Sequence, residues 1–186
     1  MAQGSFSAQI SQWVKETKDR ELAVRNKATE RIIEIMQEPG PSMATVAMAV
    51  ATGQGLGKVK ADGSRGVSRR AFGPIANPGG SGNLPVDTGF LRASLVVGRG
   101  TLNVPTTTPP ENGPQSYSWD PGDVTFAISG ASISDPIEAR YTAAYARVAE
   151  YGGKNRKARR FVALAAQQWQ GVVTQTANEL KAQAGA

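Results

Sequence analysis

Hydrophobic residues recur at helical spacing near the N-terminus of the chain. Between Ser7 and Glu38, apolar side chains follow one another three or four positions apart, with charged residues between them. This periodicity is typical of one long amphipathic helix, which we predict over residues 5–38. A Pro-Gly-Pro run follows directly and is predicted to end it. At this spacing we interpret Trp13 as a core or subunit-contact residue rather than a ligand-binding aromatic.

The stretch LPVDTGFLRASL, residues 84–95, combines several structural signals on a few residues. Its proline favours extended backbone before it, and Asp87 and Thr88 are both residue types that cap helix N-termini. The glycine that follows gives the first turn room. We therefore predict a short helix that begins here, with its apolar side chains on one face and with Arg92 and Ser94 pointing elsewhere.

Three later segments have the pattern of β-strands. Residues 95–98 contain two valines, and residues 123–129, DVTFAIS, alternate cleanly between apolar and other side chains. We predict that these two segments form an antiparallel pair joined by a loop over 101–121, which is rich in Thr and Pro. Residues 137–145 form a predicted third strand after an Asp-Pro pair.

The C-terminal part reads as two more helical segments. Residues 144–153 are predicted to form a short helical turn closed by Gly152, and residues 154–160 form a linker with five basic residues. From Phe161 the apolar spacing predicts a second amphipathic helix that runs nearly to the end. The whole chain, 1–186, is thus predicted to be one α+β domain. Its long N-terminal and C-terminal helices would pack on one face of a small antiparallel sheet, with 84–183 forming the sheet and last helix.

Residues 39–83 are predicted to be a flexible arm or insertion that becomes ordered on a partner. Gly, Ser and basic residues dominate the segment, apart from a small apolar run at 43–51 that fits either a helix or a strand. The piece GQGLGK departs from a phosphate-binding loop, because Thr52 and Val59 stand where that motif needs Gly and Ser or Thr. We interpret its arginines mainly as a solvated basic loop, with phosphate contact as the alternative.

The formal net charge of +6 is unevenly distributed along the chain. Residues 84–138 carry two basic and six acidic side chains, a net −4, whereas residues 139–186 carry eight basic and two acidic side chains, a net +6. Such alternation suits contacts between neighbouring subunits as well as contacts with nucleic acid.

The chain lacks the residue types on which most catalytic and metal sites depend. It contains neither Cys nor His, which removes disulfides, thiolate ligands and the commonest acid–base group. The acidic residues outside the terminal helices show no metal-ligand spacing and no acid–base pair, and Ser94 has no His to activate it. We therefore expect no enzyme activity, no metal and no cofactor. No apolar run approaches the roughly 20 residues that span a bilayer, and no secretion signal is apparent, so neither membrane insertion nor secretion is expected.

Three stretches resemble one protein family in the same order along the chain. They are LPVDTGFLRASL at 84–95, YARVAEYGG at 145–153 and RRFVALAA at 159–166. Together they resemble the tail-completion (head–tail joining, neck) proteins of long-tailed bacteriophages, often described as minor tail components. With the N-terminal helix, the resemblance covers most of residues 5–38 and 84–183. Two features differ from the family: the proline usually found between Arg160 and Phe161 is missing, and the arm is longer.

The resemblance implies a non-enzymatic virion protein that is present in the host cytoplasm during assembly. It would form a homo-oligomeric ring, commonly six-fold, at the neck, between the head connector or adaptor and the tail-tube or tail-terminator proteins. DNA would pass through the lumen without sequence-specific binding. A tail-terminator ring is an alternative at the same location. A basic nucleic-acid-binding protein is the competing class, which predicts binding to duplex DNA that weakens steeply with salt.

The resemblance also implies structural roles for particular residues. We expect Asp87, Thr88, Gly89 and Arg92 to hold the turn at the centre of the first stretch. Tyr145, Glu150 and Tyr151 are expected to pack near it. The residues of the family motif are Pro85, Asp87, Thr88, Gly89, Leu91, Arg92, Tyr145, Glu150, Tyr151, Gly152, Arg160 and Phe161. The candidate inter-subunit or lumen-facing residues are Arg65, Arg69, Arg70, Arg156, Lys157 and Arg159.

Overall fold

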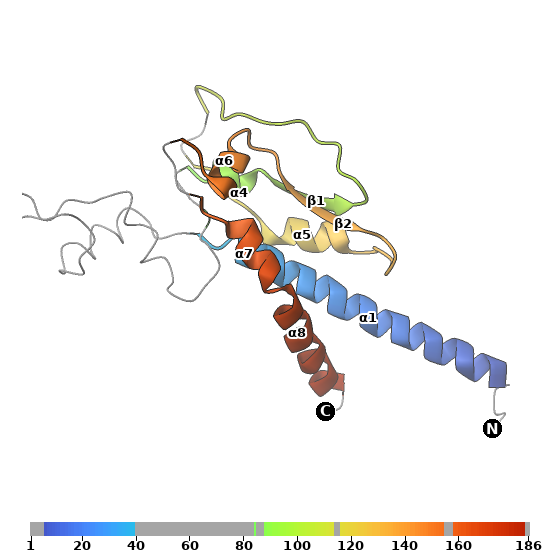
Figure 1. Cartoon of the computed structure of the whole chain (residues 1–186). Helices are drawn as coiled ribbons and strands as arrows, with labels where there is room; N and C mark the ends of the chain where they lie inside the picture. The colour runs from blue at the N-terminus through green and yellow to red at the C-terminus, as the bar shows by residue number, and fades with distance from the viewer. Residues whose placement is uncertain (1–5, 40–83, 85–87, 114–115, 155–157, 185–186) are drawn as a thin grey trace, which may run out of the picture.

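A long N-terminal helix carries the rest of the fold on its C-terminal half (Figure 1). The computed structural model of the chain describes residues 6–39, 84, 88–113, 116–154 and 158–184. The predicted arm therefore lies outside the described residues, apart from Pro39. Pro39 and Leu84 form a parallel β-bridge, and the Leu84 N–H donates to the carbonyl oxygen of Glu38 at 2.9 Å. The described residues on the two sides of 40–83 are therefore hydrogen-bonded to each other.

Helix α1, Phe6–Met36, confirms the predicted N-terminal helix. All its buried residues, Ala28, Ile32, Ile33 and Met36, lie in the last three turns, where the other elements cover it. The same apolar stripe continues to the N-terminus, but there its larger side chains are exposed. The helix is therefore packed at one end only, and Figure 1 shows the other end extending away from the remaining elements.

The sheet consists of β1, Leu95–Arg99, and β2, Ile137–Tyr141, paired antiparallel with Val97 opposite Ala139. Strand β1 confirms the prediction over 95–98, and β2 confirms the first part of the strand predicted over 137–145. The two strands pair with each other, so the predicted pairing of β1 with residues 123–129 is wrong.

Residues 123–129 belong to a helix, α5, Pro121–Ile128, instead of the predicted strand. Asp120 caps this helix, because its side chain accepts from the Gly122 N–H at 2.8 Å, and the proline stands in the first turn. Val124 and Ile128, one helical turn apart, are buried, whereas Phe126 is 83% exposed. A strand would have placed these three side chains on one face, so the same residues satisfy a helical period better.

Three short helices and one longer helix complete the fold. Helix α4, Phe90–Ala93, and helix α6, Ala146–Tyr151, match the predicted helical turns. The predicted C-terminal helix is divided into α7, Phe161–Gln167, and α8, Trp169–Ala184. The division falls at Gln168, whose N–H donates to the carbonyl of Ala165, three residues back rather than four, which tightens the last turn of α7.

The hydrophobic core has two adjoining parts. In the first, Leu84, Leu91, Ala143 and Phe161 pack together, and in the second Ala165 of α7 packs against the C-terminal end of α1. Tyr141 contacts both parts and joins them. Helix α5 lies between β1 and α1, and α7 and α8 pack on α1, so the arrangement is a mixed α+β fold with the C-terminal helices against the N-terminal one (Figure 1).

Candidate functional site

The central turn begins at Gly89, which caps α4 in a left-handed conformation with φ 85°. Its carbonyl accepts from the Ala93 N–H at 2.9 Å, and the neighbouring Thr88 carbonyl accepts from the Tyr117 N–H at 2.7 Å. The Thr88 hydroxyl accepts a long hydrogen bond, 3.4 Å, from the N–H of Phe90 in the first turn, although Gly89 rather than Thr88 stands at the N-cap position. Asp87 and Pro85 lie outside the described residues. A Cβ atom at Gly89 would collide with the Tyr117 carbonyl oxygen, so the turn requires glycine both for its φ and for its space.

Ser94 and Gln37 attach this turn to the strands and to α1. The Ser94 hydroxyl donates to the Leu91 carbonyl at 2.7 Å, and its own carbonyl accepts from both the N–H and the hydroxyl of Thr142. Buried Gln37, just after α1, donates to the Arg92 carbonyl at 3.0 Å. Ser94 is buried, and its backbone carbonyl pairs the turn with the end of β2.

Glu150 is a buried carboxylate, 5% exposed, at the N-terminus of α7. Its two oxygens accept from the N–H groups of Val162 at 3.0 Å and Ala163 at 2.9 Å. Free N–H groups and the helix dipole make this end of a helix a favourable place for a negative charge. The carboxylate therefore fixes α7 against α6, although the basic linker separates the two helices in the sequence.

The chain turns sharply where α7 begins. Arg160 has φ 55°, the only positive φ of a non-glycine residue in the described part of the chain. Its N–H donates to the Glu150 carbonyl at 3.0 Å, and the next residue, Phe161, is 1% exposed in the core. Gly152, with φ 82°, ends α6 as predicted. Both ends of the linker are thus held by Glu150 and its neighbours.

Aromatic rings connect the first motif stretch to the second, and the third to strand β2. Phe90 packs edge-on against Tyr117, with ring centroids 5.1 Å apart, and lies 6.4 Å from the ring of Tyr145. Tyr141 packs edge-on against Phe161 at 5.3 Å. Tyr151, in contrast, is 72% exposed and does not pack near the turn as expected.

Burial has an electrostatic consequence at Tyr141. Removal of the phenol from water raises its pKa well above the usual value, and the nearby charge of Glu150 adds to the shift, while Arg92 opposes it. The hydroxyl therefore stays protonated and donates a long hydrogen bond, 3.4 Å, to the Met36 carbonyl.

Arg92 lies over Trp119, with its guanidinium carbon 5.1 Å from the centre of the indole ring. This geometry is a cation–π contact. Tyr117 contacts the turn through its N–H, which donates to the Thr88 carbonyl, and Trp119 contacts it through Arg92. Neither was predicted as a site residue. The signal for them was available, since they are large aromatics in a loop otherwise rich in Thr, Pro and Gly.

The structure describes only one of the six basic candidate residues. The Arg159 N–H donates to the Ala149 carbonyl at 3.0 Å, and its side chain is partly exposed. The candidates outside the described residues are Arg65, Arg69, Arg70, Arg156 and Lys157. Their assignment to an inter-subunit or lumen-facing surface stays a prediction.

Within the described ranges, no three His, Cys, Asp or Glu side chains come close enough to hold a metal ion. No helix in that part of the chain is both long enough and apolar enough to cross a membrane. Comparison of the chain with protein-family models, with curated proteins and with solved structures finds no match.

Proposed function

We propose that this protein is a structural subunit of the neck of a tailed bacteriophage. It forms a ring, commonly of six copies, that joins the tail tube to the head connector and lets DNA pass through its lumen. The protein is present in the host cytoplasm during assembly and then in the virion. Its role is to build and hold a junction rather than to catalyse a reaction.

The observation that carries the proposal is the convergence of the three motif stretches on one packed cluster. Leu91 of the first stretch and Phe161 of the third share a buried core, and Tyr145, Ala146 and Ala149 of the second stretch pack against it. Glu150 of the second stretch caps the helix that begins with the third. Residues that resemble a family motif in three separate places thus form a single structural unit here, which supports the resemblance as more than three short coincidences.

Two polar side chains of this cluster, those of Glu150 and Ser94, are occupied by structural hydrogen bonds. Both carboxylate oxygens of Glu150 accept from backbone N–H groups, and the Ser94 hydroxyl donates to a carbonyl. A general base or nucleophile needs a lone pair or a proton that is free for substrate. The arrangement therefore favours a role in shape and assembly.

The proposal is tested by deleting the coding sequence from the phage or prophage genome that carries it and imaging the lysate by electron microscopy. We expect filled heads and separate tails in place of joined particles. Expression of the wild-type chain in trans should restore joined, infectious virions, and an empty vector should not. Joined virions formed in the absence of the chain would refute the neck role.

A further inference from the structure

The loop between β1 and α5 contains an asparagine that is followed directly by glycine. Residues 110–113 form a turn there, closed by a hydrogen bond from the Gly113 N–H to the Pro110 carbonyl at 3.1 Å. Asn112 is exposed at this turn, and no other asparagine in the sequence precedes a glycine. The Asn112 side-chain amide is therefore open to water and lies next to a residue that has no side chain.

This pair of residues is the one in which the main chain attacks an asparagine side chain with least hindrance. The attacking atom is the backbone nitrogen of the following residue, and the target is the side-chain carbonyl carbon, Cγ. A Cβ atom on the following residue crowds this approach, whereas glycine has none and turns freely. The hydrogen bond that holds the Gly113 N–H belongs to an exposed turn, and such bonds open at little cost in free energy.

We propose that Asn112 is a site of spontaneous deamidation. The Gly113 nitrogen attacks Cγ of Asn112, the new N–Cγ bond closes a succinimide ring, and the Cγ–Nδ2 bond breaks. The amide nitrogen leaves as ammonia and takes up the proton that the Gly113 nitrogen gives up. Water then opens the ring at one of its two carbonyls. Opening at Cγ gives aspartate, and opening at the backbone carbonyl gives isoaspartate, so the balance is water consumed and ammonia released.

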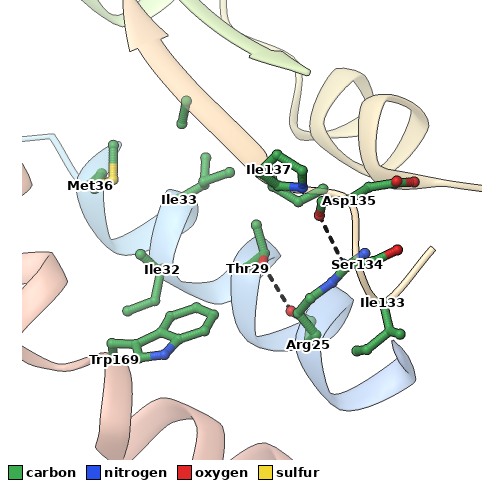
Figure 2. A pocket seen from close by; sticks show the side chains of 12 residues that line it. Arg25, Thr29, Ile32, Ile33, Met36, Ile133, Ser134, Asp135, Ile137 and Trp169 are labelled. Atoms are coloured by element: carbon green, nitrogen blue, oxygen red, sulfur yellow. Dashed lines mark hydrogen bonds between the residues drawn. The ribbon is translucent and has the colours of Figure 1, made fainter. Parts of the chain in front are cut away.

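Other asparagines in the described part of the chain provide controls within the same molecule. Asn103 is exposed in the same loop, but it precedes Val104, whose branched side chain crowds the attacking nitrogen. Asn26 lies in α1, and its side-chain oxygen accepts from the Arg25 guanidinium at 3.0 Å. Figure 2 shows that Arg25 is also bonded to the Asp135 carbonyl, so its guanidinium is held in place. Asn103 is thus the matched control for Asn112, and Asn26 is a protected one.

Isoaspartate at this position would disturb the support of the central turn, because Gly113 lies against Tyr117. A Cβ atom built on Gly113 would come 2.5 Å from the buried Tyr117 hydroxyl and 2.6 Å from Cγ of Pro110, so the main chain has no spare room there. Isoaspartate inserts an additional carbon into the main chain just before Gly113. The Tyr117 N–H donates to the Thr88 carbonyl at 2.7 Å, beside Gly89. Deamidation therefore loosens the hold of Tyr117 on the turn at Gly89.

The first test follows deamidation in the purified full-length protein at physiological temperature and mildly alkaline pH. Digestion after Glu111 separates Asn103 from Asn112, and mass spectrometry measures the mass gained when NH2 is replaced by OH at each. A sample taken at the start corrects for deamidation during digestion. Isoaspartate is counted by enzymatic methylation of its free carboxylate.

We expect Asn112 to react at least about tenfold faster than Asn103, which corresponds to a barrier lower by about 1.4 kcal/mol. The product should contain isoaspartate, and Asn112→Gln should form almost none. Equal rates at Asn112 and Asn103 would overturn the proposal. Formation of aspartate alone would also overturn it, because the reaction would then bypass the succinimide ring.

The second test measures whether the modification reaches the central turn. The new carboxylate adds a negative charge, so ion-exchange chromatography separates aged from unmodified protein. Hydrogen exchange then reports the protection of the Tyr117 N–H, which we expect to exchange at least about fivefold faster in the isoaspartate form. Asn112→Asp is the matched control, because it adds the charge without the additional main-chain carbon, and its exchange should equal that of the unmodified wild type.

Unchanged exchange at Tyr117 in the isoaspartate form would overturn the coupling to the central turn. An equal acceleration in Asn112→Asp would assign the effect to charge and overturn the main-chain explanation. Both tests use the purified chain alone, so their outcomes are independent of the proposed role in a phage neck.

Discussion

The side chain of Glu150 connects α6 to the first turn of α7. Because both carboxylate oxygens accept backbone hydrogen bonds at the start of α7, replacement by Ala leaves two N–H groups without their acceptors. We expect Glu150→Ala to lower the free energy of unfolding by about 1–3 kcal/mol. Glu150→Gln keeps one acceptor oxygen and should lose less. Urea denaturation measures both, with exposed Glu111→Gln as the control. A loss for Glu150→Ala no larger than for the control would contradict the capping role.

Gly89 offers a second test at the residue scale, with Gly100 as its matched control. Both have positive φ, 85° and 74°, but a Cβ atom would meet the Tyr117 carbonyl only at Gly89. Gly100→Ala should cost about 1–2 kcal/mol for the left-handed backbone. Gly89→Ala should cost more, because the loop that carries Tyr117 must also move. Thermal unfolding compares the two, and equal losses would mean that the close approach to Tyr117 is unimportant.

At the scale of elements, α8 is attached to α1 by Arg31. Its guanidinium donates to the Thr176 hydroxyl at 3.0 Å and pairs with the Glu179 carboxylate. The hydrogen bond from Arg31 lowers the pKa of Glu179 below its usual value of 4.5, and the same hydrogen bond raises the pKa of Arg31. The lowered carboxyl pKa means that this contribution is present above pH 4.5 and is lost as pH falls through the lowered value.

Replacement of the carboxylate should therefore remove part of the acid sensitivity of the fold. We expect the wild type to lose more thermal stability than Glu179→Gln between about pH 5 and pH 3. At pH 7 the variant should be only slightly less stable, because the pair is partly exposed. Melting temperatures measured over this range decide the point, and parallel curves for the two proteins would exclude the ion pair as the cause.

The elements that the sequence predicted correctly are those whose periodicity extends over several turns or has clear start signals. Helix α1 and strand β1 belong to this group. The segment that forms α5 was misassigned because three apolar residues at alternate positions also include an i, i+4 pair, Val124 and Ile128. The Asp120 cap and the proline after it were the deciding helix signals.

The candidate site was predictable only as a set of residue types. The resemblance pointed to Gly89, Glu150 and Phe161, but the capping of α7 by Glu150 depends on tertiary packing that no local pattern contains. The same holds for Tyr117, which reaches the central turn from a long loop. Hydrogen bonds between residues far apart in the sequence form only when the fold brings the partners together, so no local sequence pattern predicts them.

At the scale of the whole molecule, the unequal packing of α1 is the main feature. A helix of 31 residues is about 46 Å long, and its buried residues all lie near its C-terminal end. An isolated helical segment of 10 to 15 residues is only marginally stable in water. The N-terminal half of α1 therefore gains little stability from packing within the described part of the chain, in contrast to its C-terminal half.

The measurement that tests the central claim most directly is the mass of the purified full-length chain by light scattering. It should be made across a concentration series, with and without short duplex DNA at low and at high salt. A structural ring subunit predicts growth from the monomer to one discrete oligomer, with no effect of DNA. A chain that remains monomeric on its own and gains mass only when DNA is added at low salt would contradict the account and indicate a nucleic-acid-binding protein.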